Sequence, residues 1–387
     1  MILGYSRNFW LICFSLLFFI TSFNLFLPEL NEYITNMGGE NRKGLIFFLF
    51  SISAAISRPF SGKLSDTIGR KKVMYIGIII SIVATLFYPI TEVVFYFLLL
   101  RFLHGFGAGF LPTGATALVT DILPEHKRGK GMGIWGVFIS LGFGVGQIFA
   151  SPIRTELGLT NLFFIAAILG VFSAILISFV KETLPNPQKF KLSLLKVKWN
   201  DVFEPSVMPA AIVMFLSVTS SGIIFVVTQD LPGYFGLDNK GWFFGFYTLS
   251  TIFVRFFSGG LSDSIGRRKT LLIGMCIMLL SISLLAFSTE WIQFTISAIV
   301  FGIATGITSP TLFAWTADLS HIDRRGVGAG TLFIALELGI MFGSASTMLT
   351  YDNTIATIPI VFSVGITLML INISYLIWHL KYRESKT

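Results

Sequence analysis

The chain has 387 residues, of which 54% are hydrophobic and only 12% are charged, with a mean hydropathy of +0.79 and a net charge of +8. A soluble globular protein carries about 25% charged residues, so this composition excludes a soluble chain and indicates a protein whose solvent is lipid. The positive charge does not require a nucleic-acid partner, because lysine and arginine at a membrane surface serve topology and contact with anionic lipid.

Apolar runs of about the 20 residues that a bilayer requires follow one another along the chain. They predict an all-α membrane protein with twelve transmembrane helices, over residues 9–28, 44–62, 73–90, 92–118, 129–151, 161–180, 207–229, 241–260, 270–288, 291–315, 327–349 and 355–380. A polar stretch from Glu182 to Glu204 divides the runs into two sets of six, and its lysines and Trp199 indicate a segment along the inner membrane surface. We therefore predict an N-terminal bundle over 1–183, a cytoplasmic linker over 184–204 and a C-terminal bundle over 205–387.

The second half of the chain repeats the first. The segment Arg58–Lys72 recurs 197 residues later as Arg255–Lys269, with eleven of fifteen positions identical. The same shift relates further residues across almost the whole half, namely Gly105 to Gly302, Asp121 to Asp318, Arg128 to Arg325, Gly133 to Gly330, Gly142 to Gly339 and Gly146 to Gly343.

The distribution of basic residues predicts the orientation, because Lys and Arg collect on the cytoplasmic side of spanning segments. With both termini inside, only five of the 28 basic residues fall elsewhere, which leaves 23 in the cytoplasm. Four of the five are outside and one lies in the fourth predicted helix: Arg42, Lys43, Arg154, Lys240 and Arg101. We expect a multi-pass protein of the cell membrane that contacts the lipid bilayer.

The repeated loops carry a recognisable signature. Gly62-Lys-Leu-Ser-Asp66-Thr-Ile-Gly69-Arg70-Lys71 resembles the loop between helices two and three of the major facilitator superfamily, and its copy runs from Gly259 to Lys269. The pattern from Arg101 to Gly109 and the spacing of Gly133, Gly142 and Gly146 are most similar to the twelve-helix drug:proton antiporter branch. The chain departs from that branch where the usual Gly-Pro becomes Gly146-Gln147. The resemblance implies two six-helix bundles related by a pseudo-two-fold axis, and secondary transport.

The loop signature predicts a cytoplasmic gate. Arg58, Gly62 and Asp66 lie four residues apart and share a helix face, and a carboxylate such as Asp66 is favoured at a helix N-terminus. The resemblance implies that Asp66 meets the start of the eleventh helix and Asp263 the start of the fifth when the gate is shut. The expected gate residues are Arg58, Gly62, Asp66, Gly69, Arg70, Asp121 and Arg128, with their copies Arg255, Gly259, Asp263, Gly266, Arg267, Asp318 and Arg325.

Three ionisable residues inside predicted spans have no counterpart in the other half. Arg101 aligns with Ala298, His104 with Phe301 and Glu337 with Ser140. Charged groups at membrane depth are costly and usually functional, so Arg101, His104 and Glu337 are our candidates for proton coupling. The alternatives are a structural arginine, a buried neutral histidine and a carboxylate that pairs with a helix dipole or hydroxyls.

Substrates of transporters with repeated halves bind near the midplane where the halves meet. Asn24 stands where many drug antiporters have an aspartate, in Asn24-Leu-Phe-Leu-Pro28, and it becomes a hydrogen-bonding candidate. The substrate-binding candidates are Asn24, Glu29, Gln147, Asp230 and Trp315.

Together these patterns predict a monomeric transporter that exports a small amphipathic or drug-like molecule against proton entry. The first alternative is proton-coupled uptake of a small nutrient such as a sugar or an organic acid, and the second is a membrane sensor that does not transport. The sequence holds no nucleophile–base constellation and no ligand cluster, so we expect no enzyme, no metal and no cofactor.

Overall fold

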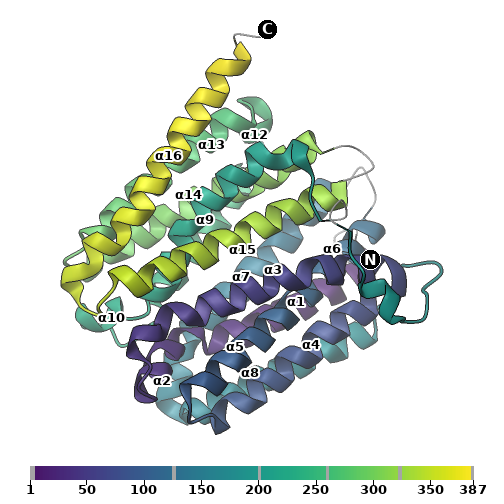
Figure 1. The fold of residues 1–387 in the computed structure, drawn as a ribbon, viewed down its shortest axis with the longest axis horizontal. Coiled ribbons are helices and arrows are strands. Elements are labelled where there is room, and N and C mark those ends of the chain that lie inside the picture. Colours follow the sequence, from purple (N-terminus) through teal and green to yellow (C-terminus); the bar gives the residue numbers. More distant parts are fainter. Residues whose placement is uncertain (1–4, 124–127, 199–201, 259–260, 321–324, 385–387) are drawn as a thin grey trace. The chain divides into compact units, whose positions relative to one another are not determined.

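The computed structural model describes residues 5–123, 128–198, 202–258, 261–320 and 325–384, and these are almost entirely helical (Figure 1). The first half contains α1 (Arg7–Leu25), α2 (Leu30–Asn36), α3 (Lys43–Ile68), α4 (Arg70–Phe87), α5 (Val94–Ala108), α6 (Phe110–Ile122), α7 (Arg128–Leu157) and α8 (Leu159–Ser178). The second half contains α9 (Met208–Val227), α10 (Leu231–Tyr234), α11 (Trp242–Ser258), α12 (Leu261–Ser264), α13 (Arg267–Ala286), α14 (Trp291–Leu319), α15 (Arg325–Thr350) and α16 (Ile358–Glu384).

Eleven helices of the described chain are long and apolar enough to cross a membrane. Each matches one of the predicted runs. The remaining run, 241–260, contains α11, whose 17 residues end at Ser258, while residues 259 and 260 lie outside the described part. The all-α membrane fold predicted from the hydropathy is confirmed.

The chain forms two compact units, one of Met1–Tyr33 with Leu49–Val202 and the other of Ile34–Phe48 with Phe203–Thr387. Inside the first unit α1 packs on α7 and α8, and α4 packs on α5, α6 and α8. Inside the second unit α9 packs on α15 and α16, and α13 packs on α14 and α16. The same pairs of repeat-related helices are therefore in contact in each unit. The predicted division at 184–204 stays a prediction, and residues 34–48 pack within the second unit.

Glycines make the closest of these contacts possible. A Cβ atom on Gly142 of α7 would lie 2.9 Å from the backbone oxygen of Leu17 on α1. A Cβ on Gly339 of α15, the repeat-related residue, would lie 2.7 Å from the backbone oxygen of Phe215 on α9. Both approaches are too short for a larger residue without a shift of the backbone, so the two halves use the same close helix packing.

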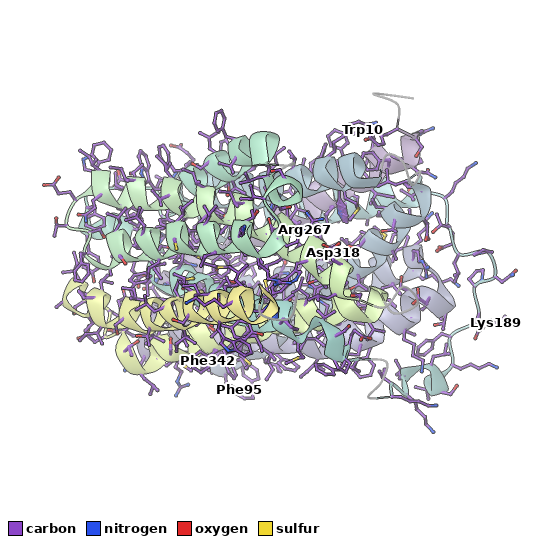
Figure 2. The ribbon with its side chains drawn as sticks, turned by 90° about the horizontal axis from the view of Figure 1, so that it is seen from above. Trp10, Phe95, Lys189, Arg267, Asp318 and Phe342 are labelled. Atoms are coloured by element: carbon purple, nitrogen blue, oxygen red, sulfur yellow. The ribbon has the colours of Figure 1, made fainter. Side chains whose placement is uncertain are left out.

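Large apolar side chains also cover the outside of the helices. Phe95 on α5 is 65% exposed and Phe342 on α15 is 46% exposed, and both point away from the helices in Figure 2. Such exposure suits a surface that faces lipid tails rather than water.

Candidate functional site

The gate signature of the first half builds a compact ion cluster at the junction of α3 and α4. The Arg70 guanidinium donates from Nη1 to Asp66 Oδ1 at 2.7 Å and to the carbonyl oxygen of Ser65 at 2.5 Å. Its Nε donates to Asp121 Oδ2, at the end of α6, at 3.3 Å. Asp66 keeps 71% of its side chain exposed, whereas Arg70 keeps only 13%. Arg70 therefore joins two helix ends, and the Asp66 carboxylate remains accessible.

Gly69 makes the sharp turn between α3 and α4. Its φ of 119° lies in a region that L side chains rarely adopt. A Cβ there would lie 2.6 Å from Glu182 Oε2. The Glu182 carboxylate accepts hydrogen bonds from the backbone N–H groups of Arg70 and Lys71 at 3.1 and 3.0 Å, and so caps the N-terminus of α4.

The second copy of the signature is simpler. Arg267 Nε donates to Asp318 Oδ2 at 2.9 Å, and its Nη1 donates to Ser262 Oγ at 2.7 Å. Figure 2 shows Arg267 and Asp318 side by side. Gly266 repeats the positive φ, at 89°, but no described atom lies within 4 Å of a Cβ placed on it.

The other gate candidates are not part of these ion pairs, or they lie outside the described residues. Arg58 Nη1 donates to Thr113 Oγ1 on α6 at 3.3 Å, and Arg255 is half-buried on α11. A Cβ on Gly62 would have no described atom within 4 Å. Gly259 and the side chains of Arg128, Asp263 and Arg325 lie outside the described part, so their roles stay predictions.

Two of the coupling candidates form one buried cluster on α5. Arg101 is 1% exposed and His104 is fully buried. The Arg101 guanidinium carbon lies 4.6 Å from the centroid of the Phe50 ring, a cation–π contact. The Tyr88 hydroxyl accepts a hydrogen bond from Arg101 and lies 3.3 Å from His104 Nδ1.

Aromatic rings surround the His104 imidazole. The rings of Phe23, Phe26 and Phe50 have centroids within 6.2, 5.9 and 5.9 Å of it. His104 Nε2 has no hydrogen-bond partner among the described residues. The cluster holds one permanent cation in an aromatic environment next to a histidine.

The third coupling candidate, Glu337, lies on α15 and is 6% exposed. It belongs to the second unit, where Gly339 and Gly343 bring α15 against α9. The residues on either side of Glu337, Leu336 and Leu338, are apolar.

Asn24 and Gln147 are hydrogen-bonded to each other. Gln147 Nε2 on α7 donates to Asn24 Oδ1 on α1 at 3.2 Å, and Asn24 Nδ2 donates to the carbonyl oxygen of Ile20 at 2.9 Å. Both side chains are fully buried. Gln147 Oε1 has no described partner.

Glu29 is held in an ion pair within the first unit. Its carboxylate accepts from Arg154 Nη1 at 2.7 Å and from Ser151 Oγ at 2.8 Å, both on α7. Arg154 also pairs with Glu32. Because Glu29 is already engaged, this geometry favours a structural role over contact with substrate.

Asp230 forms a second ion pair, between α9 and α10. Its Oδ2 lies 2.7 Å from Lys43 Nζ and accepts from the Tyr351 hydroxyl at 3.0 Å. Burial, followed by the Asp230 charge, raises the pKa of Tyr351, which keeps this hydroxyl protonated as a donor. Trp315, the last substrate candidate, is 4% exposed on α14 and meets His379 edge to face at 5.7 Å.

The whole chain is similar to known transporters. A sequence profile of the Major Facilitator Superfamily matches residues 9–238 and 210–387. The chain belongs to the Major Facilitator Superfamily.

Individual members of the superfamily match nearly the full length. The chain is 24% identical over 376 residues to quinolone resistance protein NorA of Staphylococcus aureus (strain COL), which covers 94% of each protein. It is 25% identical over 338 residues to the uncharacterized MFS-type transporter MJ1560 of Methanocaldococcus jannaschii, covering 82% of this chain and 84% of that one. The fold is similar to the crystal structure of the human organic anion transporter MFSD10 (TETRAN), with a TM-score of 0.74 at 18% identity over 96% of this chain and 99% of that one.

These matches confirm the family and the fold predicted from the repeated loop and the hydropathy. The protein is a membrane transporter of the Major Facilitator Superfamily rather than an enzyme. Two of the departures from the antiporter pattern of this superfamily, Asn24 and Gln147, are each other's hydrogen-bond partners. A neutral amide pair thus stands where the pattern has an aspartate and a proline.

Sequence reasoning did not identify three residues as members of these clusters: Glu182, Tyr88 and Lys43. Glu182 had a signal, because the 197-residue shift aligns it with His379 and it is therefore an unduplicated carboxylate. Lys43 and Arg154 were noted only as exceptions to the excess of cytoplasmic basic residues. Each of these exceptions pairs with a carboxylate, which the rule for orientation does not consider.

Proposed function

We propose that the protein is a proton-coupled secondary transporter that works by alternating access and exports a small amphipathic compound. The observation that carries this proposal is a contrast between shared and unshared residues. Ion pairs of the gate occur in both halves, as Arg70–Asp121 and Arg267–Asp318. Three buried ionisable residues within the spans have no counterpart in the other half of the chain. They are Arg101 and His104 in the first half and Glu337 in the second.

Shared and unshared residues suit different tasks. A gate that opens alternately on two sides uses the two-fold symmetry of inverted or parallel repeats, whereas substrate and coupling ion bind at one central site. Glu337 can be charged or neutral, which a proton carrier requires. Arg101 provides a fixed positive charge that is buried on α5 of the first unit.

The outer ends of the helices also suit such a cycle. Residues 34–48 precede most of the first bundle in sequence but pack in the second unit, through the Lys43–Asp230 ion pair and the stacked rings of Phe47 and Phe225 at 5.7 Å. We expect these contacts to break and form again as access alternates.

The similarity to quinolone resistance protein NorA, which extends over 94% of the chain, supports export of a drug-like compound. Uptake of a sugar or an organic acid with protons is the second candidate. It draws on Arg101, since a buried cation suits an anionic substrate group as well as a proton site.

The proposal includes a monomer in the plasma membrane with both termini in the cytoplasm. The basic residues support this orientation, since it assigns 23 of the 28 lysines and arginines to the cytoplasmic side. The protein needs no cofactor in this scheme, because the proton gradient supplies the free energy.

Proteoliposomes with an imposed pH gradient test the function and its direction. The panel is a fluoroquinolone, a lipophilic cation dye, a neutral sugar and an organic acid, each followed with a pH-sensitive dye inside the vesicles. Antiport predicts that a fluoroquinolone or the dye moves toward the acidic side while protons move the other way. Movement of a sugar or an organic acid together with protons would establish the second candidate instead.

A further inference from the structure

The segment that follows α8 is fastened to the first gate. Glu182 caps α4 through the N–H groups of Arg70 and Lys71. Thr183 Oγ1 donates at 2.6 Å to Asp121 Oδ2, the same oxygen that accepts from Arg70. Any movement of this segment is therefore transmitted directly to the residues of the gate.

The attachment continues along the linker. The backbone N–H of Gln188 donates to the carbonyl oxygen of Thr67 at 2.8 Å, and Lys63 Nζ donates to the carbonyl oxygen of Lys196. Leu194, in the short helix η5 (Leu192–Leu195), packs on an apolar cluster that includes Leu64 and Ile68 of α3. One face of the linker is thus bound to the first unit.

The repeat places no carboxylate at the position of Glu182 in the second half. The repeat-related residue is His379, and Arg268 Nη1 donates to its backbone oxygen at 3.4 Å. Gly266 has space around it where Gly69 meets the Glu182 carboxylate. Because Glu182 has no carboxylate counterpart in the repeat, the two-fold symmetry of the gate does not explain its contact with α4.

The opposite face of the linker combines exposed apolar and basic side chains. Phe190, Leu192 and Leu195 are 53%, 78% and 36% exposed. Four neighbouring lysines are exposed as well: Lys189, Lys191, Lys196 and Lys198. No acidic residue occurs from Thr183 to Lys198. Figure 2 shows Lys189 on a segment that runs outside the helices.

This composition matches a membrane interface. Single exposed apolar residues are common on protein surfaces, but three large ones within six residues, interleaved with lysines, are typical of segments that insert into the headgroup region. Each lysine near an anionic leaflet adds attraction of its own. The charge complementarity selects an anionic phospholipid surface over a neutral one.

We propose that residues 182–198 bind anionic phospholipid headgroups and so hold the first gate loop in place. The lipid contact is made by Phe190, Leu192, Leu195 and the four lysines. The link to the gate is made by Glu182. The inference rests on the gate of the proposed function. The two experiments below measure label accessibility and hydrogen exchange and do not measure transport, so their failure is distinguishable from a failure of the proposed function.

The first experiment measures where Leu192 lies. A spin label is attached to Leu192→Cys in a Cys276→Ser background, since Cys276 is exposed and Cys13 is buried. The protein is placed in nanodiscs of phosphatidylcholine alone or with phosphatidylglycerol. We expect the label to become accessible to oxygen and shielded from a water-soluble nickel complex in the anionic discs. A label that stays accessible to the nickel complex in both kinds of disc would overturn the proposal. A label that becomes shielded only after an acidic protein is added would also overturn it, because the partner of the linker would then be a protein and not lipid.

The matched control separates the linker lysines from net charge. Replacing the four linker lysines with glutamine should abolish the effect of phosphatidylglycerol on the label. Replacing Arg42 and Lys240, which lie outside the linker, with glutamine should leave the effect unchanged. Equal loss in both variants would show a general effect of charge and contradict a specific contact.

The second experiment measures the gate itself, by hydrogen exchange of the backbone amides of Arg70 and Lys71. These amides should exchange more slowly in anionic than in neutral discs. The difference should vanish in the four-lysine variant and in Glu182→Gln, although Leu192 in Glu182→Gln should still reach the lipid. Exchange that does not respond to lipid in the unmodified protein would rule out the link to the gate.

Discussion

Gly69 and Gly266 are repeat-related residues in different surroundings. Both have a positive φ, which reflects the same turn between two helices. Only Gly69 lies against a carboxylate, that of Glu182. The duplication in the sequence made both glycines gate candidates, but it contains no information on this contact, which joins residues more than a hundred positions apart.

The two glycines provide a matched pair of substitutions. Alanine at either position carries the strain of an unfavourable backbone conformation, roughly 1–3 kcal/mol. Gly69→Ala adds a collision at 2.6 Å with Glu182 Oε2 and should displace the cap of α4. We expect Gly69→Ala to lower the thermal unfolding temperature in detergent more than Gly266→Ala does. Adding Glu182→Ala should make the two alanine variants similar, and equal effects without it would contradict the cap.

The partners of Arg154 and Lys43 could be identified only in the structure. Arg154 and Lys43 were recognisable in the sequence as basic residues on the side with few of them. Their partners, Glu29 and Asp230, were interpreted as substrate-binding candidates, and both are engaged in ion pairs. A sequence shows that a charge is present, but not whether a partner on a distant helix already neutralises it.

Helices were the most predictable elements. Hydropathy alone located the runs, because a spanning helix must satisfy its backbone hydrogen bonds internally and present apolar side chains to lipid. Helix packing was less predictable. The contact of α1 with α7 depends on Gly142, whose spacing was visible, and on the Asn24–Gln147 pair, which was visible only as two separate departures from a pattern.

A double-mutant cycle measures what the amide pair contributes to the contact of α1 with α7. Gln147→Leu leaves Asn24 Oδ1 buried without its donor, and Asn24→Leu leaves Gln147 Nε2 without its acceptor. Each single change should cost about 1–3 kcal/mol. The double variant should cost less than the sum, with a coupling of about 0.5–1.5 kcal/mol, measured by thermal unfolding in detergent. Additive effects would mean that the amides act independently.

The orientation of the whole molecule rests on its basic residues. In a background of Cys276→Ser, single cysteines at Lys198, in the linker, and at Asp238, after α10, report the two sides. Both positions are exposed. An impermeant thiol reagent should label Lys198→Cys only from the inside of right-side-out vesicles and Asp238→Cys only from the outside. Labelling of both from one side would contradict the arrangement of twelve spans.

Coupling also concerns the whole molecule, because the proposed function connects one protonation event to the alternation of two bundles. Glu337 is a buried carboxylate on α15 that has no acidic counterpart in the first half, since the repeat-related residue is Ser140. Glu337→Gln keeps the size of the side chain and removes its proton exchange. We expect this variant to lose accumulation driven by a pH gradient, because a permanently neutral group cannot respond to the pH difference. Exchange of labelled substrate without a gradient should persist, which distinguishes lost coupling from lost folding.

The control for this variant is Ser140→Ala, at the equivalent position of the first half. It should retain gradient-driven accumulation, because a serine carries no titratable proton in this pH range. Both proteins are compared in proteoliposomes at equal reconstituted amounts, with accumulation and exchange measured on the same preparation. If Glu337→Gln still concentrates substrate against a gradient, Glu337 is not the essential proton carrier. The coupling site would then be sought at His104, which lies beside the fixed charge of Arg101 and shares the Tyr88 hydroxyl with it.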